Sequence, residues 1–452
     1  MDLIPKPDQV VAAASNVAHK LIYGSVADLR AMPRTLIDEG NLREVYHYRP
    51  APGVEETGDP VLLITPLAAP ALCYDLRRSC SLVEHLVQQG RPTYLVEYGE
   101  VQFKDRALGI EHWIDEVVPN AVRAASEHAG GRPVHLVGWS LGGIFALLTA
   151  ADSPDLPIAS VTSLGAPFDV AQVPLVAPLR PLLTVPGLER GAITRVYQAV
   201  GGAPKPVVKW AFQLTSVQKL VTKPLALARN LDDADFLAQI EAVDRFAANM
   251  IAYPGRTFGQ LYHRFVKGNQ LRHGAVELDH RTIELAAITV PVLVFAGATD
   301  GIAPVASVRT VLPMLTGAEE VRFEIVPGGH LGMLTGRAAR ETTWVTLDEW
   351  LTEWSGRAAA KKTARKSTAK KAPARKSAAK KSTAKKAPAK KAPAKAAKAP
   401  AKKTPAKATK ATARKTPAKK GAKRSSARPS REAIGSNTQR RYGSSGSRAL
   451  AR

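Results

Sequence analysis

The segment VHLVGWSLGGIFALL, residues 134–148, begins with an apolar run typical of a buried strand and ends with the apolar pattern of a helix. Between them lies Gly138-Trp139-Ser140-Leu141-Gly142, a G-x-S-x-G motif between a strand and a helix. The two glycines let the chain turn sharply and hold the serine in a strained conformation at the top of a sheet. The motif therefore predicts Ser140 as a nucleophile.

A serine hydroxyl attacks efficiently only when a base takes its proton, so a histidine and an acid are expected elsewhere. Among 10 histidines, His330 is the one in a glycine-flanked loop after a predicted strand, in FEIVPGGHLGM. Asp300 follows another predicted strand, in VPVLVFAGATDGIAP, and is the favoured acid; Asp169, in SLGAPFD, is the alternative. Ser140, Asp300 and His330 follow the chain order of the α/β-hydrolase fold, which we therefore expect.

Turnover also requires hydrogen-bond donors for the negative charge that develops on the substrate oxygen. The backbone N–H of Leu141 is expected to be one of them, because it lies at the positive end of the helix that begins there. The second is expected in TPLAAPALCYD, after the predicted strand at 61–64, as the backbone N–H of Leu67 or of Ala68. Backbone amides alone are predicted for this role.

Outside the motif, short apolar runs alternate with amphipathic stretches, the pattern of a mostly parallel sheet with helices on both faces. About 125 residues separate the predicted strands at 160–165 and 290–296, more than one crossover helix needs. This insert begins with a proline-dense run and continues with helical spacing at 207–220 and 233–250. A helical cap at about 167–285 is predicted over the carboxyl ends of the strands. The predicted strands span 44–48, 61–64, 93–98, 134–137, 160–165, 290–296 and 322–326.

Residues 1–40 are predicted to form an N-terminal helical segment before an α/β-hydrolase domain at 41–356. Within it, the apolar residues of 10–22 recur at helical spacing and form one stripe. A helix packed on the domain is the favoured interpretation. The alternative is a peripheral helix on a lipid surface, which normally has a more cationic polar face than this one.

Residues 357–452 differ from the rest of the chain in composition. They contain 33 Lys and Arg residues against the single acid Glu432, whereas residues 1–356 have a net charge of −7. Lys, Ala and Pro dominate, and bulky apolar side chains are too few to form a core, so a disordered tail is expected. Such a tail favours non-specific binding to nucleic acid or another polyanion, with anionic membranes as an alternative partner.

Other features limit the classes of function. Cys73 and Cys80 are too few for a disulfide framework or a zinc site, which favours a reducing compartment. We found neither a secretory leader nor a run of about 18 apolar residues, so a cytoplasmic protein is expected, with inclusion or nucleoid association left open. No residue pattern calls for a metal or an organic cofactor.

Four segments together resemble the polyhydroxyalkanoate synthases, particularly the shorter two-subunit type. They are PVLLITPLAAPALCYDLRRSCSLVEHLVQQGRPTYLVE (60–97), YPGRTFGQLYHRFVKGNQL (253–271), ITVPVLVFAGATDGIAP (288–304) and PGGHLGM (327–333). The resemblance covers roughly residues 40–350 and implies a capped α/β-hydrolase fold that acts on hydroxyacyl thioesters or polyesters. The tail resembles the linker-histone-like tails of some nucleoid and granule-coating proteins.

One position departs from the synthases: they have cysteine where this chain has Ser140, while their acid and histidine fall on Asp300 and His330. An acyl chain held as an oxygen ester is less activated for transfer than a thioester, so water competes more easily. The leading hypothesis is therefore a serine hydrolase of an apolar acyl ester or thioester. The alternatives are a synthase-like acyltransferase, and a lipid or polyester inclusion protein tethered to nucleic acid by its tail.

Overall fold

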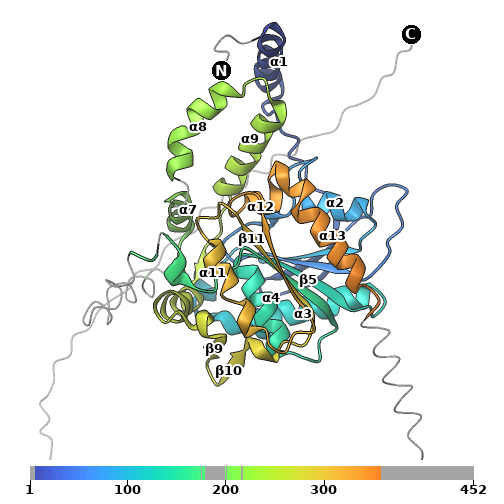
Figure 1. Ribbon diagram of the computed structural model, residues 1–452, viewed down its shortest axis with the longest axis vertical. Coiled ribbons are helices and arrows are strands. Elements are labelled where there is room, and N and C mark those ends of the chain that lie inside the picture. The colour runs from blue at the N-terminus through green and yellow to red at the C-terminus, as the bar shows by residue number, and fades with distance from the viewer. Residues whose placement is uncertain (1–5, 175, 179–198, 200, 215–216, 358–452) are drawn as a thin grey trace, which may run out of the picture. The chain divides into compact units, whose positions relative to one another are not determined.

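The computed structural model describes residues 6–174, 176–178, 199, 201–214 and 217–357 (Figure 1). The chain divides into two units, Met1–Arg375 and Lys376–Arg452, and all described residues belong to the first. The predicted tail, apart from Arg357, and the second half of the proline-dense run therefore lie outside the described residues.

An eight-stranded sheet with the order β1-β2-β4-β3-β5-β6-β11-β12 forms the centre of the domain. The strands from β4 to β12 run parallel, whereas β1 pairs antiparallel with β2, and β2 antiparallel with β4. All seven predicted strands are present, with ends shifted by a few residues. The strands are β1 (Arg34–Gly40), β2 (Arg43–Tyr48), β3 (Val61–Ile64), β4 (Thr93–Glu97), β5 (Val134–Trp139), β6 (Ile158–Leu164), β11 (Val292–Gly297) and β12 (Val321–Val326).

Helices cover both faces of this sheet (Figure 1). Alternate residues of β3 separate the two cores: Leu62 and Ile64 pack with α3, α4 and α11, whereas Val61 and Leu63 pack with α2, α12 and α13. Strands buried on both faces are nearly continuous in apolar residues, which is why β3 and β5 could be recognised. The helices are α2 (Leu82–Gln88), α3 (Val118–His128), α4 (Leu141–Asp152), α11 (Val305–Arg309), α12 (Gly332–Thr335) and α13 (Thr343–Trp354).

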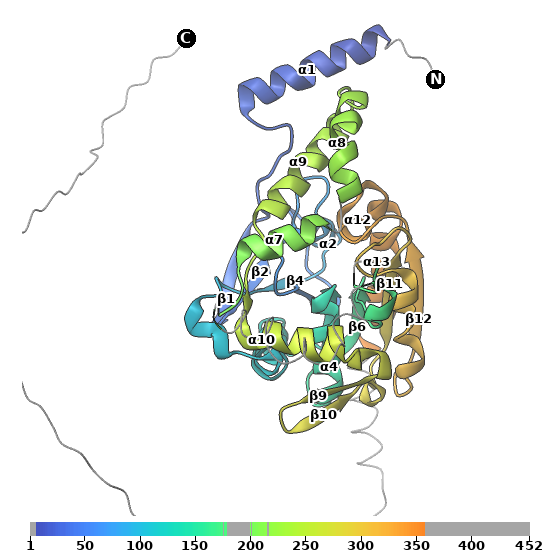
Figure 2. The same cartoon turned by 90° about the vertical axis from the view of Figure 1, so that its left-hand side faces the viewer.

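The predicted insert is present but divides into two parts, so the cap range of 167–285 is too long. Helices α7 (Lys205–Leu214), α8 (Val217–Arg229) and α9 (Ala234–Ala248) form the cap (Figure 2). The later part, from α10 (Gly255–Gln260) through the hairpin β9 (Ala275–Leu278) and β10 (Arg281–Glu284), packs instead on the α4 side of the sheet. Its apolar residues Val276 and Ile283 fill the same core as α4. The small pair β7 (Gly202–Ala203) and β8 (Tyr253–Pro254) joins the two parts.

The helix predicted in the N-terminal segment is present, but the predicted packing of its apolar stripe and the predicted domain boundary are both wrong. Helix α1 (Pro7–Tyr23) extends over the expected stripe and ends at Gly24, which adopts the left-handed conformation of a helix C-cap. None of its residues is buried, so the favoured packing of the stripe is not found. The boundary at residue 40 is also wrong, because Arg34–Gly40 forms β1 of the sheet.

Candidate active site

Ser140 lies in the turn between β5 and α4 with φ 55° and ψ −122°. A positive φ is costly for a residue other than glycine and persists only where the surrounding structure imposes it. The Ser140 N–H donates to the carbonyl oxygen of Leu164 on β6 at 2.8 Å, which fixes the turn on the neighbouring strand. A β-carbon at Gly142 would lie 2.2 Å from the carbonyl oxygen of Ile64, so only glycine allows this close approach.

The three predicted side chains meet at this turn. The Nε2 atom of His330 lies 2.9 Å from the Oγ atom of Ser140, and its Nδ1 atom lies 2.8 Å from Oδ2 of Asp300. The side chain of His330 is 8% exposed and that of Asp300 is fully buried, whereas Ser140 is partly exposed. The histidine and the acid are therefore more shielded from water than the serine residue is.

The carboxylate of Asp300 is held at both oxygens. Oδ1 accepts hydrogen bonds from the backbone N–H groups of Ile302 at 2.7 Å and Ala303 at 2.9 Å. Oδ2 is thereby directed at His330. A carboxylate that accepts from Nδ1–H selects the histidine tautomer whose Nε2 faces the hydroxyl group and can take its proton.

The alternative acid, Asp169, does not reach His330. Its side chain accepts from Asn269 Nδ2 at 2.7 Å and from the Ala171 N–H at 3.0 Å, and it lies 3.7 Å from Arg272. Burial alone would raise the pKa of Asp169, but these hydrogen bonds and the arginine charge hold it below its ordinary value. Asp169 thus caps a short helical turn and joins it to the segment around Asn269.

The predicted oxyanion donors lie on two neighbouring elements. Leu141 begins α4, and its N–H is in the first turn, where helix amides have no partner within the helix. Leu67 and Ala68 are buried in the loop after β3. Among the described residues, neither of their N–H groups makes a backbone hydrogen bond. The contact of Ile64 with Gly142 brings this loop against the start of α4.

Two aromatic residues at this turn were not predicted. Trp139 precedes the serine, and its indole N–H donates to the carbonyl oxygen of His330 at 3.0 Å, which anchors the histidine loop. Tyr74 is fully buried, and its hydroxyl group accepts from the Trp139 N–H at 2.8 Å. Trp139 fills a variable position of the motif, and Tyr74 meets it only through the sheet order, so spacing gives no signal for either.

Helix α9 covers the site from the cap. Phe246 packs edge-on against Trp139, with ring centroids 6.1 Å apart, and both side chains are buried. After α9, the N–H of Ile251 donates to the carbonyl oxygen of Ala68 at 2.8 Å. The cap is therefore attached to the loop that carries Leu67 and Ala68, the two candidates for the second oxyanion donor.

Neither cysteine offers a competing nucleophile. Cys73 and Cys80 are free and buried, as expected of small apolar residues. Burial raises the pKa of both thiols, so both stay protonated at neutral pH. The Cys80 thiol donates to the carbonyl oxygen of Thr335.

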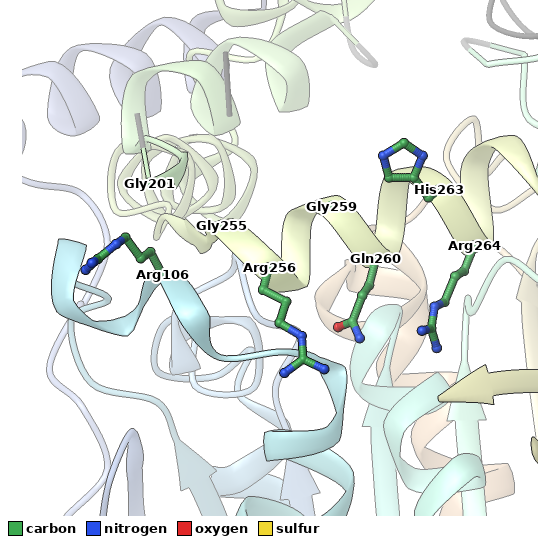
Figure 3. A pocket seen from close by; sticks show the side chains of 8 residues that line it. All are labelled: Arg106, Gly201, Gly255, Arg256, Gly259, Gln260, His263 and Arg264. Atoms are coloured by element: carbon green, nitrogen blue, oxygen red, sulfur yellow. The ribbon is translucent and has the colours of Figure 1, made fainter. Parts of the chain in front are cut away.

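A cavity of about 480 Å³ lies beside α10, and its lining includes neither Ser140 nor His330 (Figure 3). Arg256 pairs with Glu111 and Asp279, and Gln260 donates to Glu111 at 2.7 Å, so these side chains tie α10 to the segment before α3 and to the turn between β9 and β10. In Figure 3 the charged side chains do not converge on one point. The lining residues are Arg106, Gly201, Gly255, Arg256, Gly259, Gln260, His263 and Arg264.

The described residues form neither a metal site nor a membrane span. No cluster of three or more His, Cys, Asp or Glu side chains there is arranged to hold a metal ion. Likewise, the helices formed by these residues are all too short or too polar to span a bilayer.

Comparison with known proteins gives relatives over most of the chain. The poly(3-hydroxyalkanoate) polymerase subunit PhaC of Allochromatium vinosum is 25% identical over 358 residues, covering 77% of this chain and 98% of that protein. The corresponding subunit of Haloarcula marismortui is 22% identical, covering 76% and 72%. Among solved structures, a monoacylglycerol lipase of Paleococcus ferrophilus aligns at 17% identity with a TM-score of 0.40, covering 71% and 99%. The family model described as alpha/beta hydrolase fold matches residues 59–337, more than half of the chain, and the chain therefore belongs to this family of enzymes.

Proposed function

We propose that the chain is a serine hydrolase that cleaves an apolar acyl ester or thioester of the lipid or hydroxyalkanoate polyester class. The observation that carries the proposal is the position of the His330 imidazole, which bridges the Ser140 hydroxyl group and the Asp300 carboxylate. The PhaC relatives support the choice of a hydroxyalkanoate or similar acyl substrate.

The proposed reaction has two halves. Ser140 Oγ attacks the carbonyl carbon while His330 Nε2 takes the hydroxyl proton, and Asp300 stabilises the imidazolium that forms. The backbone N–H of Leu141, with that of Leu67 or Ala68, receives the oxyanion of the tetrahedral intermediate. His330 then gives its proton to the departing alcohol or thiol, which leaves an acyl group on Ser140. A water molecule releases the acid by the same steps, with His330 again as base and then acid.

A fluorophosphonate probe tests the nucleophile. The wild-type chain should be labelled at Ser140, as located by peptide mass spectrometry, and Ser140→Ala should not be labelled. Ser163→Ala is a matched control, because Ser163 is a buried serine on the neighbouring strand. Labelling that persists in Ser140→Ala would rule out the proposed nucleophile.

A synthase-like acyltransferase is the second candidate, and the PhaC relatives favour it. A hydroxyacyl thioester separates the two activities: a hydrolase gives soluble hydroxy acid, whereas a transferase gives oligomer or insoluble polymer. Both products can be measured by mass spectrometry from one reaction. Serine in place of the synthases' cysteine favours hydrolysis, because the oxygen ester is less activated for transfer to a second hydroxyl group.

The composition of residues 357–452 supports a separate proposal, that the tail binds nucleic acid or another polyanion and tethers an inclusion-bound enzyme to it. If about 8 of its cations contact phosphate, the affinity for duplex DNA should fall with a log–log salt slope of about −7. Titrations at several salt concentrations measure this slope. A slope that is unchanged when residues 358–452 are removed would contradict the assignment to the tail.

A further inference from the structure

Helix α1 presents its apolar stripe away from the rest of the domain. Leu21 is 81% exposed, Ile22 73% and Val11 70%, and Val10 is about half exposed, whereas Val17, at the edge of the stripe, lines a cavity towards α8 and α9. In an α-helix these positions share one face. Figure 2 shows α1 as a separate rod next to the ends of α8 and α9. An amphipathic helix normally packs its apolar face on the protein and exposes its polar face to water. In α1 the apolar face is the exposed one.

Polar contacts fix this reversed orientation. Gln9 Nε2 donates to Asp232 at 3.0 Å, and Asn16 Nδ2 donates to the carbonyl oxygen of Leu231 at 2.9 Å. One turn further on, Lys20 lies 3.7 Å from Glu241 of α9. These three side chains lie on one face of α1, opposite the apolar stripe. The helix is therefore attached through its polar face, and the stripe is left for another partner.

The side of α1 that faces α8 and α9 is also incompletely packed. A cavity of about 440 Å³ lies between α1, α8 and α9, and α1 contributes only Asn16, Val17 and Lys20 to its lining. Most of the stability of a helix in a protein comes from packing of its apolar face, and none of the residues of α1 is buried. An apolar partner on the stripe would therefore stabilise α1 in the position that the polar contacts set.

The size of the stripe argues against a second copy of the chain as that partner. Seventeen residues make a helix about 26 Å long, and a stripe about 10 Å wide would bury about 260 Å² per chain. A stable protein interface buries about 800 Å² on each side. An interfacial lipid layer has no such requirement, because a helix lying in its plane gains free energy in proportion to the apolar area that it buries.

We propose that the stripe of α1 docks on an anionic phospholipid membrane and that the cationic tail supplies the second attraction. Residues 1–356 have a net charge of −7 and would be repelled by an anionic membrane. The tail raises the net charge of the whole chain to +25, which reverses this repulsion. Stable attachment to membranes commonly needs two such signals, an apolar insertion and a polybasic segment.

Sedimentation of the full-length chain with vesicles tests this proposal. Vesicles of equimolar phosphatidylcholine and phosphatidylglycerol should bind the wild type, and pure phosphatidylcholine should bind it far less. The double variant Leu21→Glu, Ile22→Glu should bind the anionic vesicles at least about tenfold more weakly. The double variant Ile325→Glu, Val345→Glu is the matched control: it adds the same charge at half-exposed apolar positions of β12 and α13, and should stay within about twofold of wild type.

Three results would overturn the proposal. The wild type could fail to bind anionic vesicles at low salt. The α1 variant could bind them as well as the control variant does, which would assign binding to the tail alone. Light scattering could show a wild-type dimer that the α1 variant converts to monomer, which would assign the stripe to a second copy. Thermal unfolding of both variants establishes that the domain is folded.

Discussion

The hydroxyl group of Tyr74 accepts a hydrogen bond from the backbone N–H of Trp139 at 2.8 Å, one residue before Ser140. The same hydroxyl group donates its proton towards two carbonyl oxygens, that of Ile64 at 2.9 Å and that of Val137 at 3.1 Å. Ile64 ends β3, and the loop with Leu67 and Ala68 follows it. Tyr74 therefore connects the serine turn to the loop that carries the second proposed oxyanion donor.

Replacing Tyr74 by Phe removes this connection and changes little in volume. We expect kcat to fall by about 10- to 100-fold with KM nearly unchanged, because misplaced amides weaken transition-state binding. The free energy of unfolding should fall by about 1–3 kcal/mol, because buried polar groups lose their hydrogen-bond partner. Steady-state kinetics and urea unfolding measure the two effects. Tyr94→Phe, whose hydroxyl group contacts His128 instead, should affect stability alone; an equal loss of kcat there would contradict the positioning role.

Asp300→Asn and Asp169→Asn distinguish the two candidate acids. Asp300→Asn should lower kcat by about 10³- to 10⁴-fold, because an amide can hold His330 in the wrong tautomer. Asp169→Asn should leave kcat within about threefold, since Asp169 contacts Asn269 and Arg272 rather than the histidine. A larger loss of kcat in Asp169→Asn than in Asp300→Asn would identify Asp169 as the acid of the triad.

Gly142→Ala tests the close approach at the serine turn. The added β-carbon would meet the carbonyl oxygen of Ile64 at 2.2 Å, so β3 and α4 would have to separate. We expect a loss of about 3 kcal/mol in unfolding free energy and little labelling of Ser140 by fluorophosphonate. Gly99→Ala is a suitable control, because its nearest neighbour, Leu42, would lie 4.0 Å away. Normal labelling of folded Gly142→Ala would show that the turn tolerates the separation.

The sequence predicted those features of the fold and site that local pattern determines. The apolar runs of β3 and β5 and the glycines around Ser140 follow from burial on both sides and from a forced turn. Strand β1 was missed because RTLIDEG is an edge strand with four of its seven residues exposed and none buried, so it lacks an apolar run. The contact between Tyr74 and Trp139 joins residues 65 apart in sequence, and no local pattern specifies it. Likewise, the apolar spacing of α1 predicted a helix but not the direction of its stripe.

The buried His135 should make the protein less stable in mild acid. Its imidazole lies 2.8 Å from Ser160 Oγ and 3.2 Å from Ser355 Oγ, and burial, with the charge of Arg91, lowers its pKa to about 3. The ordinary value of about 6.5 applies in the unfolded chain, which therefore binds more protons below pH 6.5. This contribution to stability is complete above pH 6.5 and is lost as pH falls towards 3.

Urea unfolding at several pH values measures this effect. Between pH 6.5 and 5, His135 should contribute a decrease approaching about 1.4 kcal/mol per pH unit. His135→Gln keeps a polar side chain between the two serines but removes the titration. Its stability at pH 7 should be lower than that of wild type, and its pH slope in this interval should be shallower. Equal slopes in the two proteins would assign the acid sensitivity to other groups.

Ser140→Cys tests whether the nucleophile atom decides between hydrolysis and transfer. The variant would hold the acyl group as a thioester, which reacts more readily with a second hydroxyl group than the oxygen ester of the wild type does. His330 lies 2.9 Å from the present oxygen and remains available as the base. With a hydroxyacyl thioester as substrate, the ratio of oligomer to free acid should rise several-fold, measured by mass spectrometry of one reaction mixture. An unchanged ratio would mean that the cap and its access to water, rather than the serine oxygen, set the outcome.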